Sequence, residues 1–455
     1  MSDQTAPRTD ERTAGDTAGY IRAEDEAVRF TSDLIRIDTS NHGSGDACER
    51  PAAEYVAERL SEVGIVATIL ESAIGRSNVV ARIEGTDPSR PALLVHGHLD
   101  VVPASADDWS VHPFSGDVRD GVIWGRGAVD MKDMDAMILA VARAWAREGR
   151  KPVRDIVLAF TADEEDSTAY GSEWLVTEHA GLFEGCTEAI TEAGGHRFYA
   201  YGQRIYPLGA GERGRAWLRL EARGRAGHGS SPDPENAVAR LAAAVARIDA
   251  YNWPLRVSPT VRASLEQLAD LAGVQLDPDD PALSPAVLRE TLGPCAPLVA
   301  SAIRNSANPT MLSAGYKVNV IPEVAVGHVD GRIVPGGEEE FQATMDALVG
   351  PDVTWEFSLH EPAVEAPVDV PVFNAMRQAL LAEDPDGRVL PYCSGGGSDN
   401  KQFARLGING YGFVPLGLPP AYDFYAMFHG IDERVPIEAL HFGVRVLDRF
   451  LSTVH

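Results

Sequence analysis

The first part of the chain alternates between segments with a helical pattern of apolar positions and segments with the pattern of strands. Apolar residues recur every three to four positions in the former, and alternate or run continuously in the latter. The predicted helices are residues 27–37, 50–63 and 133–146, and the predicted strands are residues 67–70, 78–83, 91–96 and 155–160. Strands that alternate with helices predict an α/β domain with a mixed, mostly parallel sheet.

The middle of the chain has a different order of elements. Its predicted strands are residues 216–223, 311–319, 324–333 and 353–359, and its predicted helices are residues 236–251 and 338–348. This β-α-β-β-α-β order is the ferredoxin-like pattern of an α+β domain. Residues 253–309 are rich in proline, interrupt the pattern after its first helix, and are interpreted as an extra insertion.

These patterns predict one catalytic domain that is split by a smaller inserted domain. The first part of the catalytic domain is assigned to residues 1–212, of which residues 1–25 form a flexible polar tail. The inserted domain covers residues 213–361, and the catalytic domain continues over residues 362–455.

Composition and charge exclude several classes of protein. The 455 residues carry a formal net charge of −27, which is the wrong sign for binding nucleic acid. No apolar run approaches the roughly 20 residues of a membrane span. The polar N-terminal segment does not resemble a signal peptide, so a cytoplasmic location is expected. The four cysteines lie far apart without a C-x-x-C pair, which disfavours a disulfide framework or a thiolate zinc site.

Histidine and carboxylate residues follow the predicted strands directly. His98 and Asp100 come after residues 91–96, the pair Glu164–Glu165 comes after residues 155–160, and Asp130 ends a glycine-containing loop before a helix. Parallel sheets place functional residues at the carboxyl ends of their strands. Histidine and carboxylate side chains are ligands of zinc, and this set leaves one carboxylate spare to act as a base.

Each of these residues also has a structural interpretation. A histidine near a strand end, such as His98, is usually part of the packing, and Asp130 could cap the helix that follows it. The pair Glu164–Glu165 would ordinarily be solvated, although the run before it should be buried. His429 is ambiguous by itself. Together, however, the residues indicate a metal site that none of them indicates alone.

The combined motifs resemble the co-catalytic zinc exopeptidases and amidohydrolases of metallopeptidase clan MH. This group includes aminoacylases, glutamate carboxypeptidases, succinyl-diaminopimelate desuccinylases and carnosinase-type dipeptidases. The resemblance rests on H-L-D at residues 98–100, G-R-G-A-V-D-M-K at residues 125–132 and E-E at residues 164–165. It implies a zinc-peptidase-like catalytic domain with two Zn²⁺ per chain, for which Co²⁺ or Mn²⁺ are possible substitutes. The implied metal ligands are His98, Asp130, Glu165, Glu192 and His429.

The resemblance also implies a role for each residue. Asp130 would bridge the metals, with His98 and Glu192 on one of them and Glu165 and His429 on the other. Asp100 would orient His98, and Glu164 would be the general base. Physically, Glu164 could take a proton from a metal-activated water and pass it to the departing amine.

The inserted domain also contains a motif of this family, and the domain resembles the lid and dimerisation domain of these enzymes. In G-R-A-G-H-G-S-S-P at residues 224–232, His228 would reach the substrate carbonyl oxygen, often from the partner subunit, although it could also be a turn histidine. Asn319 and Arg332 match residues that hold the substrate carboxylate, and Gly396 lies in the family's glycine turn. The turn continues with Asn-Lys at residues 400–401, where relatives often have Ala or Gly followed by Arg. The resemblance therefore does not assign substrate contacts to these two residues. The aromatic residues between 422 and 428 would wall a pocket or simply pack.

The sequence thus predicts a dinuclear zinc hydrolase, joined as a homodimer through the lid domain. It would cleave an amide bond next to a free carboxylate in a small-molecule substrate, either an N-acyl amino acid or a short peptide. Glutamate at position 192 resembles the aminoacylase and desuccinylase side of the family. Two alternatives stay open: a non-catalytic relative that binds peptides or amino-acid conjugates, and a mononuclear, aminopeptidase-type enzyme.

Overall fold

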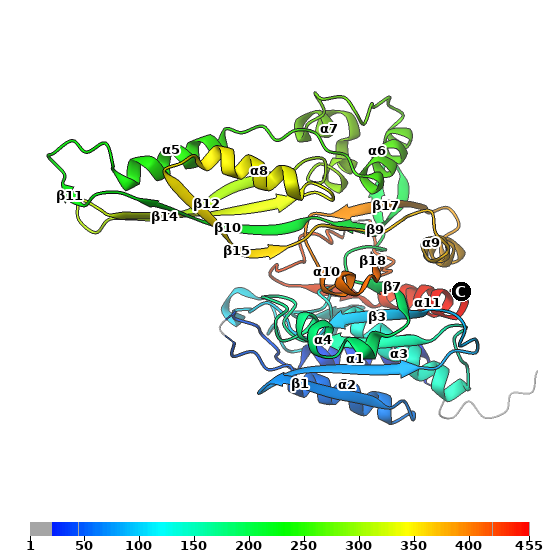
Figure 1. Cartoon of the computed structure of the whole chain (residues 1–455). Coiled ribbons are helices and arrows are strands. Elements are labelled where there is room, and N and C mark those ends of the chain that lie inside the picture. Colours follow the sequence, from blue (N-terminus) through cyan, green and yellow to red (C-terminus); the bar gives the residue numbers. More distant parts are fainter. Residues whose placement is uncertain (1–20, 44, 421, 455) are drawn as a thin grey trace, which may run out of the picture.

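The computed structural model describes residues 21–43, 45–420 and 422–454. Figure 1 shows a lower body around one large sheet and an upper arm built on a second sheet. The predicted flexible tail lies outside the described residues up to residue 20, and residues 23–25 form the first turn of helix α1 (Ala23–Ile35). None of the helices in the described ranges has the combined length and apolarity that crossing a bilayer requires.

The large sheet is mixed, and its centre is parallel. Its strands follow the order β1-β2-β6-β3-β7-β18-β9-β16, and β8 and β17 also pair with β9. The strands are β1 (Ala67–Ala73), β2 (Arg76–Ile83), β3 (Ala92–His98), β6 (Ile156–Thr161), β7 (Cys186–Thr191), β8 (Phe198–Ala200), β9 (Gln203–Glu212), β16 (Val364–Glu365), β17 (Arg388–Ser394) and β18 (Asn409–Gly412). Because β6, β3, β7 and β18 are parallel neighbours, their carboxyl ends share one edge of the sheet. This confirms the predicted α/β class.

Helices cover both faces of this sheet. They are, besides α1, α2 (Arg50–Ser61), α3 (Lys132–Glu148), α4 (Ser172–Glu178), α9 (Pro371–Glu383), α10 (Asn400–Phe403) and α11 (Ile437–Thr453), with short 3-10 helices η1 (Ala106–Asp108), η2 (Ala180–Phe183) and η4 (Ala404–Leu406). Leu93 and Val95 of β3 pack in the core that contains α3, whereas Leu94 packs on the other face with Leu175 of α4. Successive strand residues point to opposite faces. Burial of both faces explains the continuous apolar runs in the sequence.

The arm has the predicted ferredoxin-like order. It comprises β10 (Gly214–Arg223), α5 (Ala237–Asp249), β12 (Ser306–Ala314), β14 (Val324–Ile333), α8 (Glu338–Val349) and β15 (Val353–Glu361). The antiparallel sheet has the order β12-β14-β10-β15, so β12 and β15 are its edges. Leu218 and Leu220 of β10 point into a core with Leu241 of α5 and Phe341 of α8. At the end of the arm, β11 (Gly227–His228) pairs with β13 (Val320–Ile321) (Figure 1).

One strand of the arm is displaced from its predicted bounds. The sequence pattern placed it at residues 311–319, whereas β12 begins at Ser306 and ends at Ala314. Pro309, at which the predicted insertion ends, lacks the N–H that a ladder needs. Since β12 is an edge strand, this proline is tolerated, and the pairing register shifts just after it.

The extra insertion forms a small helical unit with its own core. Helices α6 (Pro259–Ala272) and α7 (Pro285–Leu292) and the 3-10 helix η3 (Gly293–Leu298) make up most of it. Ser258 and Ser284 cap α6 and α7, and each is followed by proline at the first helical position. The core of this unit includes Leu390 and Cys393 of β17, so the insertion rests on the large sheet.

Candidate metal centre and substrate cavity

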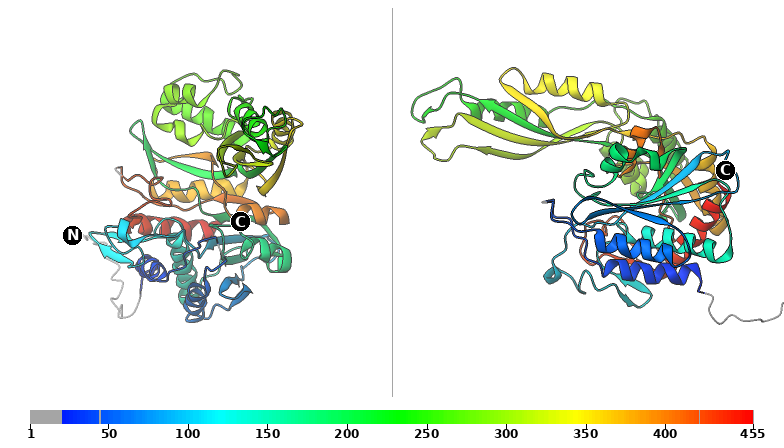
Figure 2. Two further views of the ribbon diagram at one scale, coloured as in Figure 1. Left: turned by 90° about the vertical axis from the view of Figure 1, so that its left-hand side faces the viewer. Right: turned by 60° about the horizontal axis from the view of Figure 1, so that its bottom comes forward.

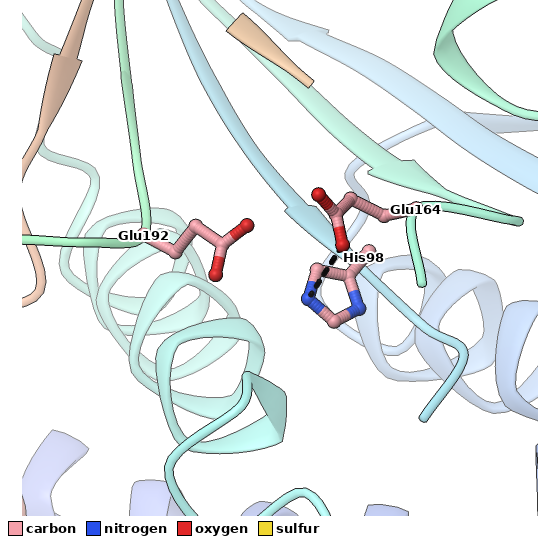
Figure 3. A group of neighbouring side chains, drawn as sticks. All are labelled: His98, Glu164 and Glu192. Atoms are coloured by element: carbon pink, nitrogen blue, oxygen red, sulfur yellow. Dashed lines mark ion pairs between the residues drawn. The ribbon is translucent and has the colours of Figure 1, made fainter. Parts of the chain in front are cut away.

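The predicted metal ligands meet at the carboxyl edge of the large sheet. His98 ends β3, Glu164 and Glu165 follow β6, and Glu192 follows β7. Their potential ligand atoms, with one from Asp130, form two groups in which all atoms lie within 4.8 Å of one another. These groups are His98, Glu164 and Glu192, and His98, Asp130 and Glu165. Figure 3 shows the carboxylate of Glu164 next to the His98 ring and the carboxylate of Glu192 directed toward both.

Asp130 lies between two histidines and offers a different oxygen to each. Its Oδ1 is 3.3 Å from Nε2 of His98, and its Oδ2 is 3.3 Å from Nε2 of His429. The same nitrogen of His429 is 3.0 Å from Oε2 of Glu165. A carboxylate that bridges two metal ions needs this placement, with one oxygen toward each ligand group.

The donor set fits divalent cations. Nε2 of His98 and Oε1 of Glu165 are buried and have no hydrogen-bond partner among the described residues. Such atoms are costly to bury unless something binds them. Imidazole nitrogen and carboxylate oxygen are the usual ligands of zinc. The structure therefore brings all five predicted ligands together, while the role of each one stays a prediction.

The cluster is also electrostatically suited to a base. Burial, and after it the negative charge of Glu165, raises the pKa of Glu164 well above its usual value, although His98 opposes the shift. Burial and the charge of Glu164 likewise raise the pKa of Glu192. Closely spaced carboxylates disfavour each other's charge, and bound cations offset this repulsion.

Asp100 organises the cluster from behind. The backbone oxygen of Asp100 lies 3.0 Å from Nδ1 of His98, nearer than its carboxylate Oδ1 at 3.6 Å. A proton held on Nδ1 leaves the lone pair of Nε2 facing the other ligands. The carboxylate of Asp100 instead accepts hydrogen bonds from the backbone N–H groups of Glu164 and Glu165, at 3.1 and 3.2 Å. Asp100 thus orders both the histidine and the glutamate pair.

Glu433 is a site residue that sequence reasoning missed. The strands β4 (Asp117–Arg119), β5 (Val122–Trp124) and β19 (Arg434–Pro436) form a small sheet that brings Glu433 against the loop ending in Asp130. Its Oε1 accepts the N–H groups of Val129 and Asp130, at 2.8 and 3.2 Å. Its Oε2 accepts from the N–H of Gly127 and the guanidinium of Arg126, at 3.0 and 2.7 Å. Burial raises its pKa to about 7.

We expect Glu433→Gln to weaken metal binding by about 10- to 100-fold, because partners behind the ligands set ligand geometry. The amide would present an N–H to backbone N–H groups that now have a carboxylate acceptor. Calorimetric zinc titration measures the change. Glu438→Gln, an exposed position on α11, is the matched control and should bind like the parent. If Glu433→Gln bound zinc with the affinity of the parent, Glu433 would not be needed to keep Asp130 in position.

A cavity of about 470 Å³ opens beside the cluster. Its polar lining includes Arg215, Arg332 and the glycine turn that contains Gly396. Its other wall is apolar and aromatic, and the residues of this wall are Ala193, Pro297, Tyr392, Phe424, Tyr425 and Phe428. His196 belongs to the same wall, stacked on Phe424 with ring centroids 4.1 Å apart, and burial lowers its pKa to about 3, so it is neutral. Phe424 also belongs to the core. The aromatic residues between 422 and 428 thus include one that both walls the cavity and packs in the core.

The predicted substrate residues fall into two groups. Arg332 and Gly396 line the cavity. His228 and Asn319 lie instead at the far end of the arm, where the N–H of Gly229 donates to the backbone oxygen of Asn319 at 2.9 Å. Figures 1 and 2 show this end, with β11, projecting away from the body. The structure therefore brings His228 and Asn319 together, but not to the cavity of their own chain.

The unusual Asn-Lys pair after the glycine turn is structural. Lys401 is buried, with Nζ 3.3 Å from Oε2 of Glu361, and Glu361 in turn pairs with Arg215 through two contacts of 2.7 Å. A Cβ atom on Gly397 would come within 2.2 Å of Nζ of Lys401. A side chain at position 397 would therefore require Lys401 to move, and Lys401 packs directly against the turn. Arg215 reaches the cavity from the entry to the arm, and nothing in the sequence pattern indicated it.

Known proteins share this architecture. The human N-fatty-acyl-amino acid synthase/hydrolase PM20D1 is 27% identical over 437 residues, which cover 93% of this chain and 86% of that protein. Aminoacylase-1 of Sus scrofa is 27% identical over 422 residues, with 89% of each chain covered. The crystal structure of the M20 family metallo-carboxypeptidase Sso-CP2 from Sulfolobus solfataricus superimposes with a TM-score of 0.70 at 18% identity, covering 94% of this chain and 99% of that one. This last likeness confirms the fold.

The family model described as Peptidase family M20/M25/M40 matches residues 94–453, a span that starts at β3 and ends in α11. It contains every predicted metal ligand, and the predicted resemblance is confirmed. The chain therefore belongs to peptidase family M20/M25/M40 and is a metal-dependent hydrolase.

Proposed function

We propose that the protein hydrolyses N-acyl amino acids whose acyl group is apolar, using two zinc ions per chain. The observation that carries this proposal is the distribution of charge around the cavity. Within the described part of the chain, its acidic lining consists of Asp130, Glu164, Glu165 and Glu192, all in the cluster itself. Arg215, Arg332 and the glycine turn line the polar side of the cavity. The opposite wall, which contains Pro297, Phe424 and Phe428, is apolar or aromatic, as expected for an acyl pocket.

This distribution favours an acyl group over the N-terminal residue of a dipeptide. The ammonium group of a dipeptide would need an acceptor or an anion when it is buried. The neutral His196 and the aromatic residues Phe424 and Phe428 offer no negative charge there. The relatives support the same choice, since their names describe a fatty-acyl-amino acid hydrolase and an aminoacylase.

The guanidinium of Arg332 suits a free carboxylate on the substrate. Its Nε and one Nη bind Asp330 at 2.7 and 3.1 Å, which fixes the plane of the group. The other N–H groups stay available, and the residue lines the cavity. A planar fork of this kind binds carboxylates through two parallel hydrogen bonds.

The residues of the chain would divide the work as follows. When bound, zinc ions supply a polarised carbonyl and a water of lowered pKa. Glu164 would accept the proton of that water on its carboxylate and later deliver it to the departing amine. Arg332 would hold the substrate carboxylate, and the aromatic wall would exclude water from the acyl side.

We expect Arg332→Ala to raise KM strongly for substrates with a free carboxylate and to matter little for the corresponding esters. The reason is that only the free carboxylate forms the ion pair. Steady-state kinetics on an N-acyl amino acid and its methyl ester measure the difference. Arg405→Ala, which replaces an exposed arginine in η4, serves as the control. Equal losses on both substrates would assign Arg332 to holding the arm through Asp330.

The proposed function is tested by an activity screen of zinc-loaded protein with N-acyl amino acids and dipeptides of matched side chains. We expect hydrolysis of the former and a metal content near two per chain by elemental analysis. Cleavage of dipeptides alone would overturn the acyl preference. Binding without turnover would favour the non-catalytic alternative, and full activity at one metal per chain would favour the mononuclear one.

A further inference from the structure

The insertion forms part of the cavity wall. Pro297 in η3 and Ser301 just after it line the cavity beside the metal cluster. A Cβ atom on Gly395 would lie 3.2 Å from Oγ of Ser301, so the insertion touches the glycine turn. Sequence alone does not show where residues 253–309 dock, because that contact is tertiary.

Pro297 and Ser301 point toward open space and not into the core of the insertion. Both are exposed, whereas their neighbours Leu298 and Ala302 are fully buried. Both are also small, so they leave room in the cavity. A larger side chain at either position would extend into the cavity that both residues line.

This wall is held rigidly in place. Leu288, Leu292 and Cys295 pack in one core with Leu390 of β17. Arg304 donates to the backbone oxygens of Trp253, at 3.1 Å, and of Leu283, which ties the ends of the insertion together. A preorganised wall discriminates between ligands because it does not yield to those that fit badly.

We infer that the insertion limits the length of the acyl group, with Ser301 and Pro297 at the position that the chain end approaches. The inference rests on the proposed function, because it assigns the acyl group to this cavity. Each methylene covered by the wall is expected to raise kcat/KM about fourfold, and a chain that meets the wall loses this gain. Length selection would thus reside in a segment separate from the catalytic residues.

The test compares Ser301→Trp with the parent on N-acetyl, N-hexanoyl and N-dodecanoyl derivatives of one amino acid. We expect kcat/KM for the acetyl substrate to stay within about twofold, and that for the dodecanoyl substrate to fall at least about tenfold, mainly through KM. Inhibition of acetyl-substrate hydrolysis by decanoate should weaken in parallel, which reports binding apart from turnover of the long substrate. Ala286→Trp places the same side chain on the exposed face of α7, away from the cavity, and should behave like the parent.

The outcomes separate the two proposals. If the parent hydrolyses none of the N-acyl substrates, the proposed function fails and so does this inference. If the parent hydrolyses them but Ser301→Trp lowers all three equally, or none, the proposed function stands and the length limit is wrong. Thermal unfolding and metal content verify that the variant is folded. Ser301→Leu, a smaller change, should give an intermediate limit, and its failure to do so would also count against the inference.

Discussion

Replacing Glu164 by glutamine is expected to lower turnover by about 10²- to 10⁴-fold while the fold and the metal ligands stay in place. Oε2 of Glu164 lies 3.9 Å from Nε2 of His98, at the edge of the cluster (Figure 3). One of its carboxylate oxygens lies within 4.8 Å of possible ligand atoms of His98 and Glu192, which is within reach of a water held by the cluster. Glutamine has the same shape but cannot take a proton from that water, so the loss should fall on kcat.

The fold should survive this change because the position is held by its backbone. The N–H of Glu164 donates to Asp100, a contact that glutamine retains. Elemental analysis and thermal unfolding should therefore match those of the parent. Glu178→Gln, on the exposed end of α4, controls for loss of a carboxylate elsewhere. If the Glu164→Gln variant turned over substrate at the parental rate, the assignment of proton transfer to Glu164 would be wrong.

The metal cluster was predictable from sequence because it follows from strand geometry. Apolar runs that are buried on both faces mark β3, β6 and β7, and parallel neighbours in register end at the same edge. A histidine or glutamate placed just after each run is therefore brought to the same place. The side chains of His98 and Glu164 could be grouped from this pattern, whereas Glu192 was assigned to the cluster from the family resemblance.

Glu433 shows what such reasoning cannot reach. Besides Arg126, its partners are the backbone N–H groups of Gly127, Val129 and Asp130, about three hundred positions earlier in the chain. Backbone donors carry no signal in the sequence, so a glutamate four positions after His429 looks like any surface charge. The position of the insertion on the large sheet could not be predicted either, because no local sequence pattern reports it. Its helices had clear start signals at Ser258 and Ser284, but its contact with β17 is tertiary.

The position of His228 leads to the second large prediction, that of a shared active site. His228 is exposed and is absent from the cavity lining of its own chain. It belongs to β11, at the end of the arm that projects away from the body (Figure 1). The same end exposes large apolar side chains on and after the edge strand β12: Met311 is 64% exposed and Tyr316 is 85% exposed. An unpaired edge strand with apolar side chains is suited to pairing with a second copy across a two-fold axis. We therefore propose a homodimer in which His228 of the partner subunit completes each site.

Complementation between two inactive variants distinguishes this arrangement from the alternatives. Glu164→Gln and His228→Ala should each be nearly inactive alone, and a mixture dissociated and reassociated should recover activity. Random pairing of equal amounts gives about a quarter of all sites an intact Glu164 from one chain and an intact His228 from the other. His328→Ala, on β14 of the four-stranded sheet of the arm, should remain active by itself, which controls for loss of a histidine from the arm. Differently tagged chains verify that subunits exchanged. Exchange without recovery would mean that His228 serves its own chain's site or takes no part in catalysis, and a strictly monomeric protein with full activity would exclude the shared site altogether.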